Sequence, residues 1–249
     1  MKKITSADIS GMIDHSLLNP AMTAKDIREG CLVAKEYSTA TVCVKPSFVE
    51  EAAAVLKGSE VKVTTVIGFP HGSNLTDVKG FESERALAQG CRELDMVLDI
   101  GRLLGGQYDY VENDIRAVAA AAHKKDALLK VILENAYLNE ELIVRACKIC
   151  EAAGADFVKT STGYAPSGAK LSDLRIMRAA VSDKVRVKAA GGIRTLEAAL
   201  MVMAVGATRF GCTATVSIME EARKREASGT LLPLEDTGGE LEERHSKTY

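Results

Sequence analysis

Residues 152–160 read AAGADFVKT, a pattern in which a glycine separates the end of a helix from the start of a buried strand. The same pattern returns at residues 88–97, AQGCRELDMV, and at residues 204–211, AVGATRFG. A glycine at this point takes the left-handed conformation that ends many helices, because it has no side chain to oppose it. Three copies of one helix–glycine–strand unit indicate a chain in which helices and strands alternate.

Eight short runs rich in apolar and β-branched residues alternate with amphipathic segments. The expected strands are residues 11–14, 40–44, 61–67, 93–100, 128–133, 157–160, 185–189 and 208–211. Helical periodicity marks residues 23–37, 46–56, 75–89, 109–123, 139–153, 171–180 and 195–204. Parallel strands need such crossover helices, and eight units in 249 residues favour a closed TIM (β/α)₈ barrel over an open doubly wound sheet.

The composition is that of an ordinary globular protein. The chain carries a formal net charge of −2, and 47% of its residues are hydrophobic. This near balance of charge argues against a nucleic-acid or membrane surface, and no run approaches the ~18 apolar residues that span a bilayer. The N-terminus has no apolar leader, so we expect a cytoplasmic protein whose partners are small molecules.

We expect a single domain followed by a tail. Residues 1–227 contain every expected strand and helix and form the barrel. Residues 228–249 hold proline, glycines and many charges, which is typical of a loose segment, and we expect this tail to be mobile.

The six cysteines are scattered along the chain and form no disulfide framework. Cys147 and Cys150 have CxxC spacing but lie within a helical pattern, so buried helix packing is favoured over a metal or redox role. The sequence has no HExxH motif or Cys/His cluster, and we therefore expect neither a metal ion nor another cofactor.

Three of the expected strands each contain a lysine. Lys130, Lys159 and Lys188 follow one another at a spacing of 29 residues, about one strand–helix unit. If all three face the interior, desolvation and like charge both favour a neutral amine, which can attack a carbonyl and form a Schiff base. The competing interpretation is that each lysine extends to the rim or faces a helix. Three lysines in register favour the first interpretation.

Two of the expected strands contain carboxylates. Asp95 shares its strand face with Glu93, and Asp14 ends the weak first strand. A buried carboxylate beside lysines can relay protons or simply neutralise charge, and both roles stay open. We expect Asp95 to lie nearer to the substrate or Lys188 than to Lys159, because a carboxylate next to Lys159 opposes the loss of its proton.

Glycine-containing turns follow the last three expected strands. The turns are TSTG at residues 160–163, AGGIR at 190–194 and GCT at 211–213. In a TIM barrel, the loops after strands seven and eight commonly bind phosphate through backbone N–H groups at a helix N-terminus. A cationic interior beside a phosphate-binding edge indicates a phosphorylated carbonyl substrate that reacts through an imine.

Five stretches together resemble the deoxyribose-phosphate aldolase family: TVCVKP at residues 41–46, ELDMVLDIG at 93–101, LLKVILE at 128–134, DFVKTSTG at 156–163 and VKAAGGIR at 187–194. The resemblance extends from about Asp14 to Gly211. It implies a class I aldolase of deoxyribonucleotide catabolism that cleaves 2-deoxy-D-ribose 5-phosphate to acetaldehyde and D-glyceraldehyde 3-phosphate. It also implies a homodimer or homotetramer.

The resemblance implies roles for individual residues as well. Lys159 matches the Schiff-base lysine, Lys188 the lysine that perturbs its pKa, and Asp95 the proton-relay aspartate. The positions that match substrate-binding residues are Asp14, Cys43, Lys130, Thr160, Gly163, Gly191, Gly192, Arg194, Gly211 and Thr213. Ala214 departs from the paired serines of the family. Tyr249 matches a C-terminal tyrosine that reaches the active site in some members, and an idle tail residue is the equal alternative.

Two other functions stay open. One is another class I sugar-phosphate aldolase on the same barrel, such as one that cleaves a keto-acid phosphate, although no additional arginine stands out to bind the carboxylate. The other is a sugar-phosphate-binding protein that has lost catalysis. The presence of Lys159, Lys188 and Asp95 argues against it.

Overall fold

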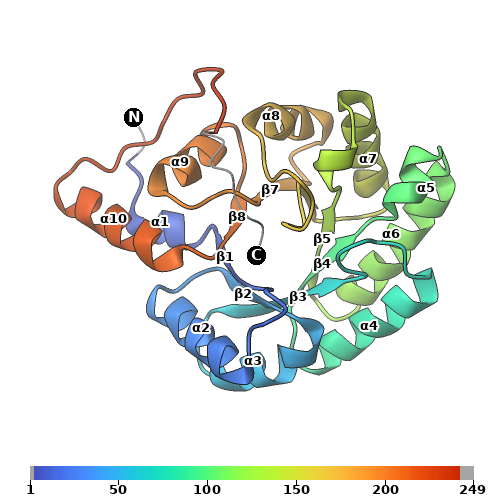
Figure 1. Ribbon diagram of the computed structural model, residues 1–249, viewed down its shortest axis with the longest axis horizontal. Coiled ribbons are helices and arrows are strands. Elements are labelled where there is room, and N and C mark those ends of the chain that lie inside the picture. Colours follow the sequence, from blue (N-terminus) through green and yellow to red (C-terminus); the bar gives the residue numbers. More distant parts are fainter. Residues whose placement is uncertain (1–2, 242–249) are drawn as a thin grey trace.

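The computed structural model describes residues 3–241, and within them eight parallel strands close into a barrel in the order β1 to β8 (Figure 1). The strands are β1 Ile13–Leu17, β2 Thr41–Val44, β3 Lys62–Ile67, β4 Glu93–Val97, β5 Leu128–Ile132, β6 Phe157–Lys159, β7 Arg186–Ala190 and β8 Arg209–Cys212. The predicted TIM barrel is confirmed, and the open sheet is excluded because β8 pairs with β1.

Helices surround the strands on all sides in Figure 1. The α-helices are α1 Ser6–Ser10, α2 Ala24–Glu36, α3 Val49–Val55, α4 Thr76–Ala88, α5 Ile100–Leu104, α6 Tyr108–His123, α7 Glu140–Ala152, α8 Leu171–Ala180, α9 Leu196–Ala204 and α10 Thr215–Ala227. Two short 3₁₀ helices, η1 Pro46–Phe48 and η2 Asn135–Tyr137, follow β2 and β5. The sequence patterns did not indicate α1, α5 or α10.

The fourth strand is shorter than its sequence predicted. The apolar run continues to Ile100, but the strand ends at Val97 and α5 begins at Ile100. The cause is Asp99, whose side chain accepts a hydrogen bond from the Arg102 backbone N–H at 3.0 Å and so caps the new helix.

The strand register decides which lysines are neighbours. Lys159 of β6 pairs directly with Lys188 of β7, as the spacing of 29 residues led us to expect. Lys130 of β5 pairs with Asp95 of β4, whereas Lys159 is level with Ile132. Lys130 therefore lies two residues deeper in the barrel than the other two lysines.

The hydrophobic core fills the space between the strands and the helices. All six cysteines are buried and unpaired, including Cys147 and Cys150 on the inner face of α7. Burial raises the pKa of Cys147 to about 12, so this thiol stays neutral at physiological pH. No helix in the described part of the chain is long and apolar enough to cross a membrane.

A fully buried ion pair joins two helices of this layer. Lys79 of α4 is fully buried and its Nζ lies 2.5 Å from Asp114 Oδ2 of α6 and 3.1 Å from the Val97 carbonyl oxygen. Thr76 also donates to Asp114, at 2.9 Å. The cluster therefore ties two helices to the end of β4.

Removing either partner should destabilise the protein strongly. We expect Lys79→Met to lower the free energy of unfolding by about 3–5 kcal/mol, because Asp114 is left as an unpaired buried charge. Urea unfolding measures this change. The double variant Lys79→Met/Asp114→Leu should recover much of the loss, and a single variant as stable as the double would contradict the account.

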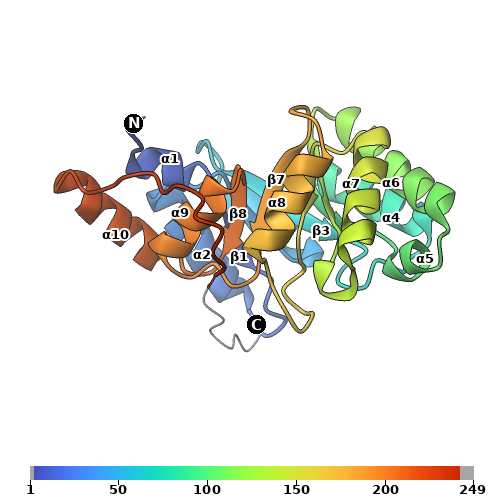
Figure 2. The same ribbon diagram turned by 90° about the horizontal axis from the view of Figure 1, so that it is seen from above.

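The described part of the C-terminal segment contains no helix or strand after α10 and runs across α9 towards α8 (Figures 1 and 2). Asp236 accepts hydrogen bonds from Arg175 at 2.8 and 2.6 Å. Glu240 accepts the backbone N–H groups of Leu171 and Ser172 at the start of α8, at 2.7 and 2.6 Å. The mobility of residues 228–249 stays a prediction, and Tyr249 lies outside the described residues.

Candidate active site

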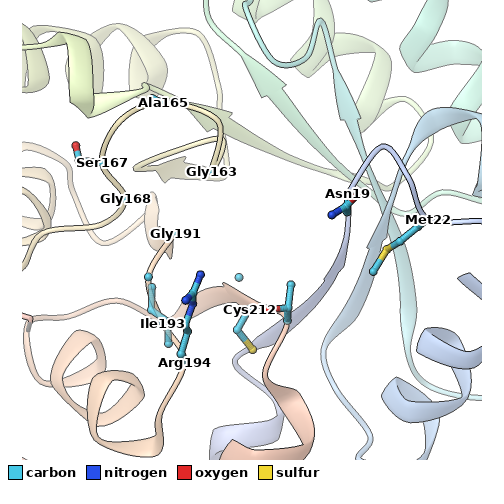
Figure 3. A pocket seen from close by; sticks show the side chains of 13 residues that line it. Asn19, Met22, Gly163, Ala165, Ser167, Gly168, Gly191, Ile193, Arg194 and Cys212 are labelled. Atoms are coloured by element: carbon cyan, nitrogen blue, oxygen red, sulfur yellow. The ribbon is translucent and has the colours of Figure 1, made fainter. Parts of the chain in front are cut away.

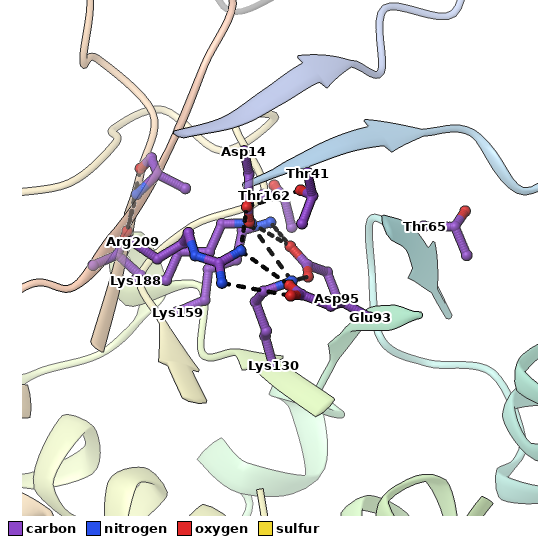
Figure 4. A network of polar contacts seen from close by, with 12 residues as sticks. Asp14, Thr41, Thr65, Glu93, Asp95, Lys130, Lys159, Thr162, Lys188 and Arg209 are labelled. Atoms are coloured by element: carbon purple, nitrogen blue, oxygen red, sulfur yellow. Dashed lines mark hydrogen bonds and ion pairs between the residues drawn. The ribbon is translucent and has the colours of Figure 1, made fainter. Parts of the chain in front are cut away.

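Inward-facing charged side chains from several strands meet inside the barrel (Figure 4). Lys159 Nζ and Lys188 Nζ each lie 2.6 Å from the same oxygen, Oδ2 of Asp95. The two nitrogen atoms are therefore within about twice that distance of each other. All three side chains are buried, with Lys159 the most accessible at 3%.

The three lysines differ in how many carboxylates they contact. Lys130 Nζ forms ion pairs at 2.5, 2.9 and 3.6 Å with Glu93, Asp95 and Asp14. Lys188 has two such partners, because it also contacts Asp14 at 2.5 Å. Within the described residues, the ion pairs of Lys159 are limited to Asp95. Lys159 is therefore the ammonium group that loses the least when it gives up its proton.

The electrostatics of the carboxylates favour their charged form. Burial alone would raise the pKa of Asp95, but the ammonium groups of Lys130, Lys159 and Lys188 outweigh it and hold the pKa well below its usual range. Asp14 behaves in the same way, and its pKa is also lowered. Both groups are carboxylates at neutral pH.

The prediction that Asp95 lies away from Lys159, nearer to the substrate or Lys188, is wrong, because Asp95 Oδ2 lies 2.6 Å from both Lys159 Nζ and Lys188 Nζ. Burial is the largest single influence and lowers the pKa of Lys159, but the charge and the hydrogen bond of Asp95, with a contribution from Cys43, together outweigh burial, and the pKa is raised above its ordinary value. Lys159 is thus a paired ammonium. Its proton must be removed before the amine can act as a nucleophile.

Two further predicted residues complete this part of the site. Asp14 accepts hydrogen bonds from Thr41 at 2.8 Å and from Arg209 at 2.7 Å. Cys43 of β2 is buried, and burial, together with the charge of Asp95, raises the pKa of its thiol to about 11. Cys43 therefore presents a neutral, weakly polar wall to the charged network.

A cavity of about 310 Å³ opens at the C-terminal ends of the strands (Figure 3). Six of its lining residues were predicted from the sequence: Gly163, Gly191, Gly192, Arg194, Gly211 and Thr213. The remaining lining residues are Asn19, Met22, Ala165, Ser167, Gly168, Ile193 and Cys212. The turn at residues 190–194 leads into α9, whose first turn is capped by Thr195. This is the helix N-terminal environment that favours an anion.

Glycines allow two loops of the cavity wall to touch through their backbones. A side chain at Gly168 would lie 2.5 Å from the Gly191 carbonyl oxygen, which no real contact permits. Gly191 itself has a φ of 83°, and its carbonyl accepts the Ala169 N–H at 3.0 Å. The cavity edge is therefore rigidly built from main chain.

The cavity adjoins the charged network. A methyl group placed on Gly211, which lines the cavity, would lie 3.7 Å from Cε of Lys188. A ligand whose anionic end occupies the cavity can thus extend its other end toward Lys188 and Lys159.

Not every predicted residue faces this cavity. Thr160 is buried, and its hydroxyl donates to the Ala190 carbonyl at 3.1 Å and accepts the Ala190 N–H at 3.0 Å. Its visible role is to join the ends of β6 and β7. Across residues 3–241, no group of three or more His, Cys, Asp and Glu side chains is arranged to hold a metal ion.

Sequence reasoning missed three charged residues of the site. Glu93 was noted only as sharing a strand face with Asp95. Arg209 was not considered, although it is two residues from Gly211 and so lies on the same inward face of its strand. Glu134 accepts hydrogen bonds from the backbone N–H of Thr162, at 3.1 Å, and from its hydroxyl, and so holds the loop after β6. Strand alternation was the available signal for Glu93 and Arg209.

A TIM barrel with buried lysines in its interior and a cavity at the carboxyl ends of its strands is the architecture of an enzyme, and sequence comparison identifies the class of enzyme. Residues 10–218 match the family described as DeoC/LacD family aldolase. The chain belongs to this family, which makes it a carbon–carbon lyase.

Relatives named deoxyribose-phosphate aldolase are similar over most of their length. The Clostridium perfringens protein is 51% identical over 85% of this chain and 94% of its own, and the Rhodopirellula baltica protein is 46% identical over 88% and 90%. The solved structure of an aldolase called QR15 has a TM-score of 0.84 at 40% identity, covering 89% of this chain and 98% of its own. The tetrameric deoxyribose phosphate aldolase of Aeropyrum pernix has a TM-score of 0.81 at 28% identity, covering 87% and 92%. The resemblance inferred from the sequence motifs is confirmed.

Proposed function

We propose that the protein reversibly cleaves 2-deoxy-D-ribose 5-phosphate to acetaldehyde and D-glyceraldehyde 3-phosphate through a Schiff base on Lys159. The observation that carries this proposal is the geometry of Lys159. It is the least paired of three buried lysines, and its neighbour Lys188 adjoins an anion-binding cavity. The names of the relatives support the choice of substrate.

The cavity accounts for the phosphate. Backbone N–H groups of the turn at residues 191–194, the start of α9 and the guanidinium of Arg194 provide positive potential for a phosphate dianion. With the phosphate held there, the aldehyde carbon C1 at the far end of the five-carbon chain is directed to Lys159.

The reaction then needs an amine, an electron sink and two proton transfers. The neutral amine of Lys159 adds to C1, and loss of water gives the imine. The C3 hydroxyl loses its proton, the C2–C3 bond breaks, and its electrons move into the imine to form an enamine. Protonation of C2 and hydrolysis release acetaldehyde and restore the lysine.

Asp95 and Lys188 are placed to move these protons. Asp95 Oδ2 contacts both amines at 2.6 Å, so a proton can pass between Lys159 and Lys188 through one oxygen. Lys188 also weakens the attraction between Asp95 and Lys159, because both ammonium groups contact the same carboxylate oxygen. We assign Lys188 and Asp95 this relay, and Asp14, Lys130 and Cys43 the surrounding wall of the substrate site.

The reaction is tested by incubating the protein with 2-deoxy-D-ribose 5-phosphate and measuring both products separately. Equimolar acetaldehyde and D-glyceraldehyde 3-phosphate support the proposal. Turnover of a keto-acid phosphate in place of this substrate would assign the site to another sugar-phosphate aldolase, and tight binding with no turnover would indicate a non-catalytic binding protein.

The phosphate contributes binding energy that positions the reacting carbon. We therefore expect 2-deoxy-D-ribose without phosphate to react with a kcat/KM lower by about 10²-fold or more. Arg194→Ala should raise the KM for the phosphorylated sugar and leave kcat/KM for the free sugar unchanged. Inorganic phosphate should compete with the phosphorylated substrate. An equal kcat/KM for the two sugars would show that this cavity does not bind the phosphate group of the substrate.

We also propose a homodimer or homotetramer that acts in the cytoplasm. The solved relative from Aeropyrum pernix is described as a tetramer, which supports self-association. Light scattering after size-exclusion chromatography measures the assembly, and a monomer at micromolar concentration would contradict this part of the proposal.

A further inference from the structure

The charged network inside the barrel does not balance when every group is ionised. Within residues 3–241 its ion pairs join three carboxylates to four bases: Asp14, Glu93 and Asp95 to Lys130, Lys159, Lys188 and Arg209. All seven residues are buried, and Arg209 is the most exposed at 9%. Loss of a single proton from one base makes the numbers of positive and negative charges equal.

Arg209 cannot be the group that loses this proton, because a guanidinium stays charged in proteins. It lies on β8, and its Nη1 contacts Asp14 Oδ1 at 2.7 Å and Glu93 Oε2 at 3.1 Å. Its cationic face also lies over the ring of Phe157, 5.4 Å from the centroid. Arg209 is thus fixed at two carboxylates that would otherwise serve the lysines alone.

This arrangement determines how the lysines share Asp95. Arg209 neutralises part of the negative charge of Asp14 and Glu93. Lys188 and Lys130 therefore each form a further ion pair with Asp95, at 2.6 and 2.9 Å. Lys159 must then share its one carboxylate with two other ammonium groups. The surplus positive charge is therefore least stabilised on Lys159.

We propose that Arg209 and Glu93 are a pair of opposed positioning residues, in which Arg209 promotes and Glu93 resists the loss of the proton from Lys159. Neither residue touches the substrate. The inference rests on the proposed role of Lys159 as nucleophile and adds the cause of its reactivity. The effect is electrostatic, so the two residues act with opposite sign.

Other ionisable groups face the same space, and the test leaves them unchanged except for Arg186, which is replaced in a control variant. They come from the strands and the segments beside them: Asp14, Cys43, Cys91, Asp95, Lys130, Glu134, Arg186 and Lys188. Arg186 is the useful control, because its guanidinium stacks on the same Phe157 ring at 4.0 Å and forms no ion pair with the three carboxylates within the described residues.

The experiment is the pH profile of kcat/KM for Arg209→Met, Glu93→Gln and the double variant. The rising limb reports the deprotonation of Lys159 in the free enzyme. We expect Arg209→Met to move this limb upward by about one pH unit, and Glu93→Gln to move it downward by a similar amount. The double variant should return close to the wild-type profile, because it removes one charge of each sign.

Two controls separate charge from packing. Arg209→Lys keeps the positive charge and should leave the limb near its wild-type position, even if stability falls. Arg186→Met removes a guanidinium from the same ring but breaks no ion pair with the three carboxylates in the described part of the chain, and it should move the limb clearly less than Arg209→Met does. If Arg209→Met fails to fold, the downward shift expected for Glu93→Gln still tests the proposal, and an unchanged or upward-shifted limb in Glu93→Gln would contradict it.

The proposal would be contradicted if the limbs of Arg209→Met and Glu93→Gln shifted in the same direction, or if both limbs stayed unchanged while stability fell. Arg209 and Glu93 would then form an ion pair with a structural role only. This outcome differs from failure of the proposed function. In that case the wild-type protein itself would form no imine at Lys159, whatever the profile of the variants.

Discussion

Lys159→Met should lower kcat for aldol cleavage by at least ~10³-fold, because the side chain that forms the covalent intermediate is lost. Methionine has a similar length and no amine. The remaining buried network then holds three carboxylates and three bases, so the barrel should unfold at the same or a higher urea concentration than the wild type.

Lys159→Arg is the matched control. Arginine keeps a positive charge beside Asp95 but does not form the imine under these conditions, so its loss of activity should equal that of the methionine variant. Activity within tenfold of the wild type in either variant would show that another group is the nucleophile.

Lys188→Leu should reduce activity at pH 7 by about 10²-fold or more and displace the pH profile. In the wild type, Asp95 Oδ2 is shared between Lys188 and Lys159 at equal distance. Without Lys188, Asp95 keeps only Lys159 and Lys130 as ammonium partners, its Oδ2 contacts Lys159 alone of the lysines, and the pKa of Lys159 rises further above its ordinary value. Since the amine reacts only when neutral, the rising limb of kcat/KM must move to higher pH.

Lys188→Arg is expected to keep part of this electrostatic effect while losing proton transfer, so its limb should lie closer to the wild type than that of Lys188→Leu. The pH dependence of log kcat/KM from about pH 6 to 11 measures the displacement of the rising limb in both variants. Near-normal activity with an unchanged profile in Lys188→Leu would show that Lys188 is a structural residue.

The fold and the pairing of two interior lysines were accessible from the sequence, because strand–helix units repeat regularly and side chains alternate between the two faces of a strand. Once eight strand–helix units are recognised, Lys159 and Lys188, one unit apart, must lie on adjacent strands, and the register pairs them directly. The glycine turns at residues 190–194 and 211–213 follow from the same periodicity, since they occupy the carboxyl ends of β7 and β8.

The geometry of the charges was not accessible, because it depends on register and rotamers that act across strands. Lys130 has the same sequence spacing as Lys159 but lies deeper, next to Asp95. Like charge and desolvation together predicted a lowered pKa for Lys159, whereas its ion pair with Asp95 reverses the direction. Arg209, more than a hundred residues from Glu93, gave no local signal of its ion pair.

The capping of α8 by Glu240 is hidden for a similar reason. Residues 228–241 have the composition of a loose segment, but two carboxylates of this segment bind Arg175 and the first N–H groups of α8. Such contacts follow from where the chain returns in space, which composition does not encode.

Borohydride reduction in the presence of 2-deoxy-D-ribose 5-phosphate, followed by peptide mapping with mass spectrometry, tests the central claim most directly. The account predicts a reduced adduct on the peptide that contains Lys159, absent in Lys159→Met and weakened by competing inorganic phosphate. An adduct confined to Lys130 or Lys188, or full turnover with no trapped adduct, would contradict the assignment of Lys159 as the Schiff-base lysine.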